Sequence, residues 1–257
     1  MARIFITGSA QGLGLMTGQL LAEGGHEVVL HARDAARAAA TRAALPDVAG
    51  MMEGDVATLA GMRAVAAQVN AFGSFDAVIH NVAIGYREPR RDITADGLPA
   101  LFATNVLAPY ALTALMHRPR RLIYLSSGMH HHVRTEIDDM LWERRRWNGS
   151  TAYAESKLYD AMLAFAIARQ WPDTISNALE PGWVPTRMGG AGAPDDMDQA
   201  HRTQAWLAVS NDPAAMRSGR YFYHLEERAA NPEAHDPALA RRLLDRCAAF
   251  SKIELPS

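Results

Sequence analysis

Short apolar runs alternate with longer amphipathic segments along most of the chain. Apolar runs of strand length lie at 3–7, 27–31, 75–80, 121–126, 174–180 and 219–224. Helical spacing of apolar residues marks 12–24, 34–45, 59–72, 100–116, 151–170 and 237–250. Continuously apolar strands separated by amphipathic helices are typical of a parallel sheet with helices on both faces. The pattern therefore predicts a doubly wound α/β fold with about seven parallel strands.

Nothing in the pattern divides the chain into separate parts. The 257 residues show no internal repeat and no linker-like shift in composition, and α/β folds of this length commonly form one unit. We therefore expect a single domain, 1–257. Two stretches lack a regular period: 128–150, rich in His, Arg and Trp, and 185–197, rich in Gly, Pro and Asp. Loops on a rigid scaffold often carry substrate contacts.

Charge and cysteine content narrow the classes of function. Lys and Arg total 26 against 28 Asp and Glu, and the net charge of -2 gives no general attraction to nucleic acid or anionic membranes. The first apolar run reaches a Thr-Gly turn too early for a signal peptide, and no apolar stretch nears the ~18 residues of a spanning helix. We expect a cytoplasmic protein with a small-molecule partner. The single Cys247 excludes an intrachain disulfide and fits an apolar helical stripe better than a reactive thiol.

The sequence TGSAQGLG, residues 7–14, joins the first apolar run to the first helical segment. Such a turn needs glycine for positive φ and for close approach of backbone to a phosphate, and the helix N-terminus then favours negative charge. Gly8, Gly12 and Gly14 fit these roles. The turn is a candidate dinucleotide phosphate site.

The end of the second strand bears on the choice of dinucleotide. In dinucleotide-binding folds an acid there accepts from the ribose 2′-hydroxyl, whereas an arginine pairs with a 2′-phosphate. Here Ala32 takes the acid position and Arg33 follows, with a guanidinium suited to a bidentate phosphate contact. The alternative is a solvated arginine at a strand end. Asp34 is better placed as a helix N-cap, so we expect NADP(H) to be preferred, with NAD(H) possible.

Tyr153 and Lys157 lie four apart on one predicted helix and share a face. A free phenol has a pKa of about 10, and a neighbouring ammonium lowers it, so the pair can act as a proton donor to a carbonyl. Together with TGxxxGxG, Asn105 in FATNVLAP, the serine pair ending at Ser127 and the later PGWVPT, the chain resembles the short-chain dehydrogenase/reductase family from about residue 3 to 188. The ending GRYF resembles the tail of some retinol-dehydrogenase-like members.

The resemblance implies a Rossmann fold and a role for each matching residue. Tyr153 would be the acid/base, Lys157 would hold the nicotinamide ribose and lower the tyrosine pKa, and Ser127 would hydrogen-bond the substrate oxygen. Asn105 would anchor a water in a proton relay behind Lys157. The implied cofactor contacts are Gly8, Ser9, Gln11, Gly12, Leu13, Gly14, Arg33, Asp55, Val56, Asn81, Val82, Ala83, Tyr153, Lys157, Pro181, Gly182, Val184 and Thr186. Of these, Asp55 would contact adenine, and Val184 and Thr186 the nicotinamide carboxamide and nearby phosphate.

Two features depart from the family pattern. His80-Asn81-Val82-Ala83 stands where Asn-Asn-Ala-Gly is usual, which places bulkier side chains near the cofactor. Ser127 and Tyr153 are 26 positions apart, roughly double the usual spacing, so 128–150 contains an insert. It resembles the longer segment of retinol-dehydrogenase-like or carbonyl-reductase-like relatives. In the family, the helix with Tyr153 often forms a dimer or tetramer contact that such an insert would block, so homo-oligomer and monomer both stay open.

Several side chains of the insert have two interpretations. Trp142 and Trp147 would either wall a hydrophobic substrate pocket or pack the insert onto the body. Arg144 to Arg146 are most simply a solvated face, with recognition of an anionic substrate as the alternative. Among His130 to His132, neighbouring side chains of an extended chain point to opposite faces and no second ligand cluster accompanies them, so we predict no metal site and place them in a loop beside the active-site mouth.

The predicted function is an NADP(H)-preferring oxidoreductase that interconverts a carbonyl and an alcohol on a small to medium hydrophobic substrate. Hydride transfer would be accompanied by proton transfer at Tyr153. The rival function is a catalytically silent NADP(H)-binding sensor or regulator, which predicts loss of Ser127, Tyr153 or Lys157, and all three are present. By resemblance, residues 185–220 would close over the substrate, but their sequence does not identify it.

Overall fold

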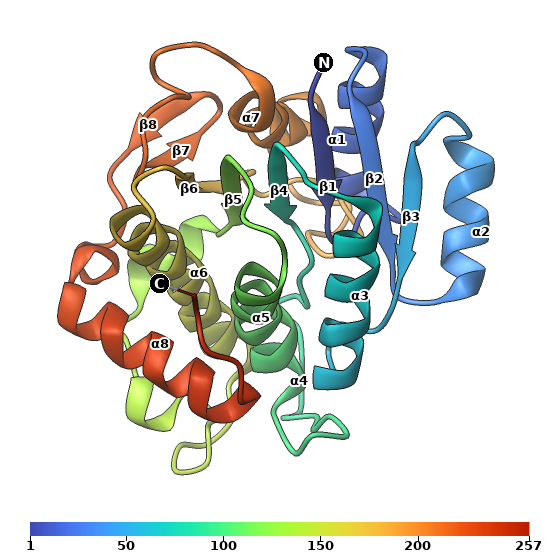
Figure 1. Cartoon of the computed structure of the whole chain (residues 1–257). Helices are drawn as coiled ribbons and strands as arrows, with labels where there is room; N and C mark the ends of the chain where they lie inside the picture. Colours follow the sequence, from blue (N-terminus) through green and yellow to red (C-terminus); the bar gives the residue numbers. More distant parts are fainter. Residues whose placement is uncertain (257) are drawn as a thin grey trace.

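A computed structural model describes residues 1–256, and within them the strands form a single sheet (Figure 1). The strands are β1 (Arg3–Ile6), β2 (Glu27–Ala32), β3 (Gly50–Glu53), β4 (Ala77–His80), β5 (Arg121–Leu125), β6 (Ile175–Glu180), β7 (Tyr221–Tyr223) and β8 (Glu226–Arg228). Their order is β3-β2-β1-β4-β5-β6-β7-β8, and every pairing is parallel except that of β8 with β7. The predicted α/β fold with seven parallel strands is confirmed. The single domain expected for 1–257 stays a prediction, and residue 257 lies outside the described residues.

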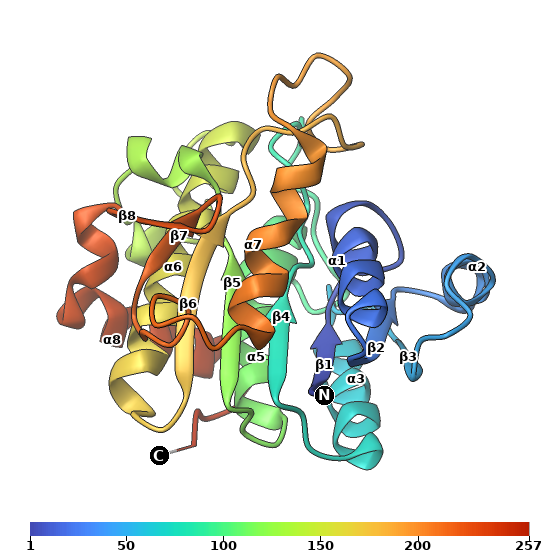
Figure 2. The ribbon, with the colours of Figure 1, turned by 90° about the horizontal axis from the view of Figure 1, so that it is seen from above.

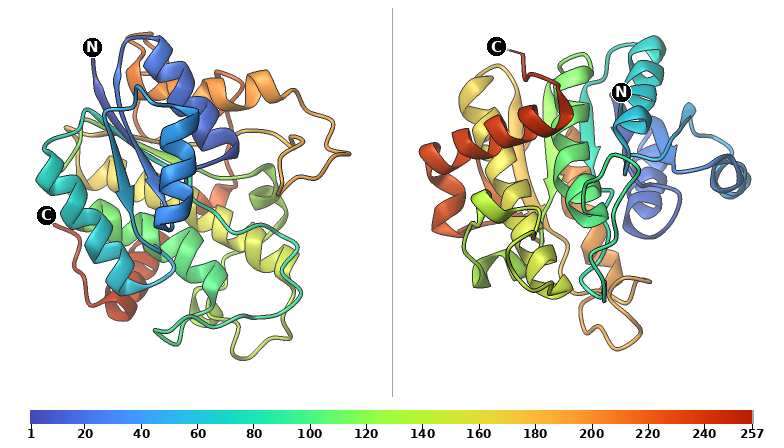
Figure 3. Two further views of the ribbon diagram at one scale, coloured as in Figure 1. Left: turned by 90° about the vertical axis from the view of Figure 1, so that its right-hand side faces the viewer. Right: turned by 90° about the horizontal axis from the view of Figure 1, so that it is seen from below.

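Helices cover both faces of this sheet (Figures 2 and 3). On one face lie α1 (Gly12–Glu23), α2 (Ala35–Ala44) and α7 (Met197–Val209), and on the other α3 (Leu59–Phe72), α5 (Ala108–Leu115) and α6 (Gly149–Gln170). Each face buries its own apolar cluster against the sheet. The last helix, α8 (Pro237–Ser251), packs outside α5 and α6 and buries Cys247, as its apolar position predicted.

The sequence pattern did not predict β3, β8 or α7. Strand β3 is four residues long, and β8 is wholly charged and exposed, so neither gives a clear apolar run. Helix α7 lies within 185–220, where its polar composition hides the buried stripe of Ala200, Ala205 and Leu207. Asp34 caps α2 by accepting from the Arg37 backbone N–H, as predicted.

The insert folds back onto α6 instead of projecting as a loop. It contains the short 3₁₀ helices η2 (Gly128–His132) and η3 (Ile137–Asp139). With α8 and η4 (Pro232–His235), these elements cover the outer side of α6, 16 of whose 22 residues are buried. In residues 1–256 no helix has the length and apolarity needed to cross a bilayer.

Arg145 shows that the insert is anchored by charge. The expectation of a solvated face at Arg144 to Arg146 holds for the two outer arginines but is wrong for Arg145. Its guanidinium donates to Asp139 Oδ2 at 2.9 Å and to Glu155 Oε1 at 2.6 Å, and these carboxylate side chains are 9% and 4% exposed. It also lies over the ring of Trp142. Arg145 therefore joins the insert to α6.

Candidate active site

The segments that carry most of the predicted site residues lie at the carboxyl ends of the strands. Strands β1, β4, β5 and β6 are parallel neighbours, so the segments that follow them emerge side by side. These segments are 7–14, 81–83, 126–128 and 181–186. Ligands of doubly wound folds bind outside the carboxyl ends of the strands, which is where the structure brings these segments together.

The glycine turn is packed tightly against the segment after β4. Gly8 has φ +60°, and a Cβ there would lie 2.7 Å from Val82 Cα, so only glycine fits. Asn81 Nδ2 donates to the carbonyls of Thr7 and Gly8 at 3.0 Å. A Cβ on Gly14 would meet that same amide at 2.5 Å. Asn81 and Val82 thus fix the turn's shape.

His31 on β2 holds the turn from the other side, a role that the sequence did not reveal. Its Nδ1 accepts from Gly8 N–H at 3.0 Å and its Nε2 pairs with Gly54 O at 2.9 Å. Because a carbonyl can only accept, the proton lies on Nε2 and the ring is neutral. Burial lowers the pKa of His31 and favours this form. Ser9 is also buried, with its hydroxyl donating to Ile6 O and accepting from His31 N–H.

The N-terminus of α1 is left open toward the site. Its cap residue, Gln11, makes no side-chain capping hydrogen bond. Gly12 has φ +58°, and a Cβ there would find no atom within 4 Å. Unpaired N–H groups at a helix start beside open space favour a phosphate, so the turn has the donors and the room that a dinucleotide pyrophosphate needs.

Arg33 lies at the end of β2 with an exposed side chain. Its Nε is 3.9 Å from Asp34 Oδ2, and the side chain is 59% exposed. Asp34 is occupied by its cap and by Arg37, so it is poorly placed to accept from a ribose. Asp55, after β3, is exposed, whereas Val56 is buried.

Tyr153, Ser127 and Lys157 meet beyond the end of β5. Tyr153 is 6% exposed and hydrogen-bonds the Ser127 side chain. Lys157 Nζ is 5.8 Å from the centre of the Tyr153 ring. Burial raises the pKa of Tyr153, while Lys157 and the Ser127 hydrogen bond act in the opposite direction. The lowering effect of Lys157 on the tyrosine pKa, expected from the sequence, is therefore present, and burial outweighs it.

Asn105 lies in a local widening of the helix predicted at 100–116. The segment is divided into α4 (Ala100–Phe102), a π-helical turn η1 (Ala103–Leu107) and α5. Asn105 is fully buried and exchanges hydrogen bonds with the Ile84 backbone N–H and carbonyl. Its Nδ2 also donates to Ser156 Oγ at 3.0 Å. Single π-turns are frequent at functional sites, and this one links the segment after β4 to α6.

Apolar side chains pack around Tyr153. Tyr86 packs edge-on against it at 5.9 Å between ring centres. Met129, Trp147 and Met188 pack against the same cluster. The segments after β4 and β6 meet here, with the Tyr86 hydroxyl donating to Gly189 O and Thr186 accepting from Gly189 N–H. The surroundings of the phenol are therefore apolar, with Ser127 as the polar contact.

His130, the first of the three adjacent histidines, links the insert to the C-terminal part of the chain. His130 is fully buried; its Nδ1 donates to Ser127 O at 2.7 Å and its Nε2 accepts from Asn231 N–H at 3.1 Å. One nitrogen thus holds the backbone of the candidate catalytic serine, and the other holds that of Asn231. The described residues contain no cluster of metal-ligating side chains. The expected loop at 130–132 is in fact part of η2.

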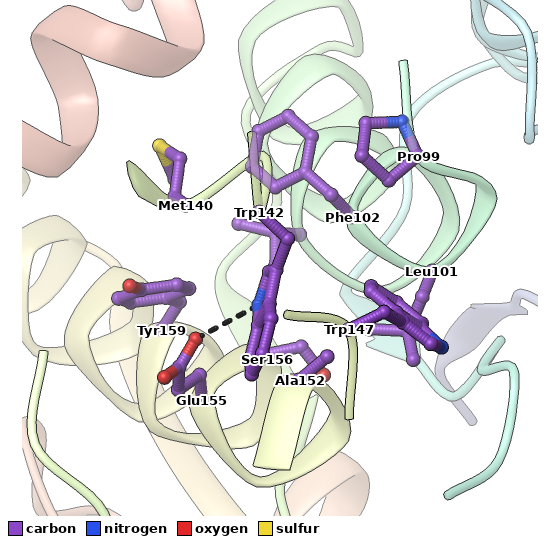
Figure 4. Close-up of a pocket in the computed structure, with 11 residues that line it drawn as sticks. Pro99, Leu101, Phe102, Met140, Trp142, Trp147, Ala152, Glu155, Ser156 and Tyr159 are labelled. Atoms are coloured by element: carbon purple, nitrogen blue, oxygen red, sulfur yellow. Dashed lines mark hydrogen bonds between the residues drawn. The ribbon is translucent and has the colours of Figure 1, made fainter. Parts of the chain in front are cut away.

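The two tryptophans of the insert differ in position. Trp142 is buried and its indole N–H donates to Glu155 Oε2 at 3.1 Å (Figure 4). Both tryptophans line a small pocket of about 10 Å³ between α6, α4 and the insert, room for roughly one water. Trp142 therefore packs the insert onto the body, the second of its two interpretations. Trp147, half-buried, donates to Glu88 O and contacts the apolar cluster at Tyr153.

Comparison with known proteins gives the family. The sequence pattern of the short chain dehydrogenases matches residues 2–129. An uncharacterised oxidoreductase of Emericella nidulans is 41% identical over 100% of this chain and 99% of its own length. This chain belongs to the short-chain dehydrogenase/reductase family. A short-chain dehydrogenase of Gibberella zeae is 37% identical over the full length of both chains.

A solved structure supports the fold of this short-chain dehydrogenase/reductase. An uncharacterised protein from Mycobacterium paratuberculosis superposes with a TM-score of 0.86, covering 100% of this chain and 96% of its own, at 24% identity. That identity supports the fold alone. Family membership makes the protein an NAD(P)-dependent oxidoreductase acting between a carbonyl and an alcohol on a small molecule.

Proposed function

We propose that this short-chain dehydrogenase/reductase prefers NADP(H) and interconverts a carbonyl and an alcohol on a small to medium hydrophobic substrate. The observation that carries the proposal is the meeting of Tyr153, Ser127 and Lys157 inside an apolar cluster at the strand ends. The cytoplasmic location expected from the sequence stays a prediction.

The residues present fit a bound dinucleotide. The uncapped start of α1 and the open side of Gly12 suit the pyrophosphate. Arg33 supplies an exposed guanidinium at the ribose end of β2, where Ala32 offers no carboxylate. Asp55 and Val56 on the adenine side, and Pro181, Gly182, Val184 and Thr186 on the nicotinamide side, are proposed contacts. The cofactor, when bound, supplies the hydride.

The chain's own residues handle the proton. The Ser127 hydroxyl donates to the substrate oxygen and orients it, and Tyr153 donates its phenolic proton to that oxygen as negative charge develops. The ammonium of Lys157 stabilises the resulting phenolate. Tyr86, Met129 and Met188 exclude water from the phenol. Asn105, held by Ile84 and Ser156, is proposed to anchor the water through which Tyr153 regains its proton.

The test is consumption of NADPH with a panel of hydrophobic ketones and aldehydes. Tyr153→Phe should lower kcat by at least about a hundredfold, since acid catalysis commonly contributes that much. Tyr159→Phe is the matched control, because Tyr159 is also buried on α6 but its hydroxyl accepts from the Glu136 backbone. Unchanged turnover in Tyr153→Phe contradicts the mechanism. If the protein is instead a catalytically silent NADP(H)-binding regulator, it should bind NADPH and turn over no carbonyl of the panel.

The cofactor preference has its own test. Arg33→Asp removes the proposed phosphate partner and places a ribose acceptor there, so the ratio of kcat/KM for NADPH to that for NADH should fall by at least about tenfold. Arg37→Asp is less suitable as a control because Arg37 pairs with Asp34. Arg42→Asp, in the last turn of α2, serves as the control instead. An unaltered ratio in Arg33→Asp means that Arg33 is only a solvated arginine.

A further inference from the structure

Lys157 is paired with a buried carboxylate that the proposed mechanism does not use. Its Nζ is 2.8 Å from Asp160 Oδ2, three residues further along α6, and the two side chains are 2% and 3% exposed. The same ammonium donates to Leu125 O at 2.7 Å. An ammonium has three N–H groups. Two are thus engaged on the protein side, which leaves one for the cofactor side.

Asp160 has Lys157 as its one ion-pair partner among residues 1–256. Its other oxygen, Oδ1, is buried and has no hydrogen-bond partner in the described part of the chain. Burial raises the pKa of Asp160 to about 6, and Lys157 acts against that rise. A carboxylate in such a position is costly unless it balances a buried cation. Its contribution is therefore to be sought at Lys157.

We propose that Asp160 is a positioning residue that balances the buried charge of Lys157 and directs its free N–H toward the cofactor and Tyr153. This rests on the proposed function, in which Lys157 holds the nicotinamide ribose and stabilises the Tyr153 phenolate. Without Asp160 the buried ammonium keeps a single backbone carbonyl as compensation, so it is no longer held beside the phenol. A displaced ammonium no longer stabilises a phenolate.

The other groups around the pair provide no replacement charge. Burial raises the pKa of Tyr153, Tyr124 and Tyr221, so these neighbours stay neutral. Burial lowers the pKa of His130 and of His80, which stay neutral too. The remaining acid on a packed strand is Glu180 of β6, which faces Tyr221 and the Gly128 N–H. The titratable groups that face the pair are Tyr153 on α6, Tyr124 on β5, Tyr221 on β7, His130 on η2, His80 on β4 and Glu180 on β6.

The experiment compares wild type with Asp160→Asn, which removes the charge and keeps the shape. The first measurement is kcat/KM for alcohol oxidation against pH, in which the rising limb reports ionisation of Tyr153. The second is NADPH affinity at pH 7 by fluorescence titration, which needs no turnover. Glu155→Gln is the matched control, because it also neutralises a buried carboxylate on α6, one that pairs with Arg145 and not with Lys157.

The proposal predicts that Asp160→Asn moves the limb toward higher pH by about one unit and weakens NADPH binding about tenfold, while Glu155→Gln leaves both unchanged. Movement of the limb toward lower pH would overturn it, because Asp160 would then act only as a negative charge that raises the pKa of Tyr153. An unmoved limb with unchanged affinity would overturn it as well. If Asp160→Asn does not fold, the smaller Asp160→Ser takes its place.

Failure of the proposed function is distinguishable from failure of this proposal. A wild-type protein that turns over no carbonyl or alcohol contradicts the proposed function. The affinity comparison between wild type, Asp160→Asn and Glu155→Gln still decides whether Asp160 supports Lys157.

Discussion

Removal of Arg145 should release the insert from α6. In Arg145→Met an apolar side chain takes the place of the guanidinium that lies over the Trp142 ring, and Asp139 and Glu155 lose the partner that they share. Both carboxylates are largely buried. The variant tests whether ion pairing holds the insert in place.

The size of the effect follows from the burial of the three groups. Breaking a buried ion pair by removing one partner costs about 3–5 kcal/mol. The guanidinium side chain is 29% exposed, which favours the lower end, ~3 kcal/mol. For a chain of this length each kcal/mol shifts the unfolding midpoint by roughly 2–4 °C, so the midpoint should fall by about 10 °C.

The assay is thermal unfolding followed by circular dichroism at pH 8, with Arg146→Met as control because that neighbouring side chain is exposed. The double variant Arg145→Met/Glu155→Gln should regain part of the loss, since one uncompensated charge is gone. The deficit should also shrink at pH 5, because Glu155, whose pKa burial raises against the effect of Arg145, then takes up a proton more readily. A midpoint for Arg145→Met within about 2 °C of wild type would show that these ion pairs do not hold the insert in place.

Three further predictions concern other parts of the chain. Gly14→Ala places a Cβ 2.5 Å from Asn81 Nδ2 and should weaken NADPH binding about tenfold in a fluorescence titration, with the unobstructed Gly192→Ala as control; equal affinities would contradict the tight packing of the turn. Folding lowers the pKa of His130 to about 4, so the unfolded chain binds more protons between about pH 4 and 6.5 and the free energy of unfolding should fall as the pH drops through that window. His130→Gln should reduce this fall in urea unfolding at pH 5 and 7, and an identical dependence would rule His130 out as a contributor. Because its own chain covers α6, the protein should be a monomer by light scattering, and a stable dimer whose contact maps to α6 would show otherwise.

The features that the sequence revealed depend on local rules. The glycine turn, the cap at Asp34 and the pair Tyr153 and Lys157 each follow from residues a few positions apart. Asp160 could have been found in the same way, as an acid three positions after Lys157 on the same helix. The order of strands and helices followed from the alternation of apolar runs.

The features that the sequence hid depend on partners far along the chain. The ring of His130 is fixed by Asn231. Arg145 is held between Asp139 and Glu155, and no periodic pattern in the sequence indicates these contacts. A run of three arginines is typical of a solvated face. The sequence does not indicate the two buried carboxylates that lie beside one of them. In the π-helical turn, Asn105 accepts from the backbone N–H of Ile84, and this distant contact is likewise not indicated by any helical period.

The tie between His130 and Asn231 has a consequence for how activity is lost. Ser127 lies where the end of β5 meets the layer formed by the insert and the C-terminal segments. Proteins open in cooperative units whose free energies lie below that of global unfolding. If this layer opens as such a unit, hydrogen exchange at the amides of η2 and η4 should quicken together while those of β1 and β2 stay protected. Such a partly opened molecule would retain its dinucleotide and yet be unable to orient a carbonyl.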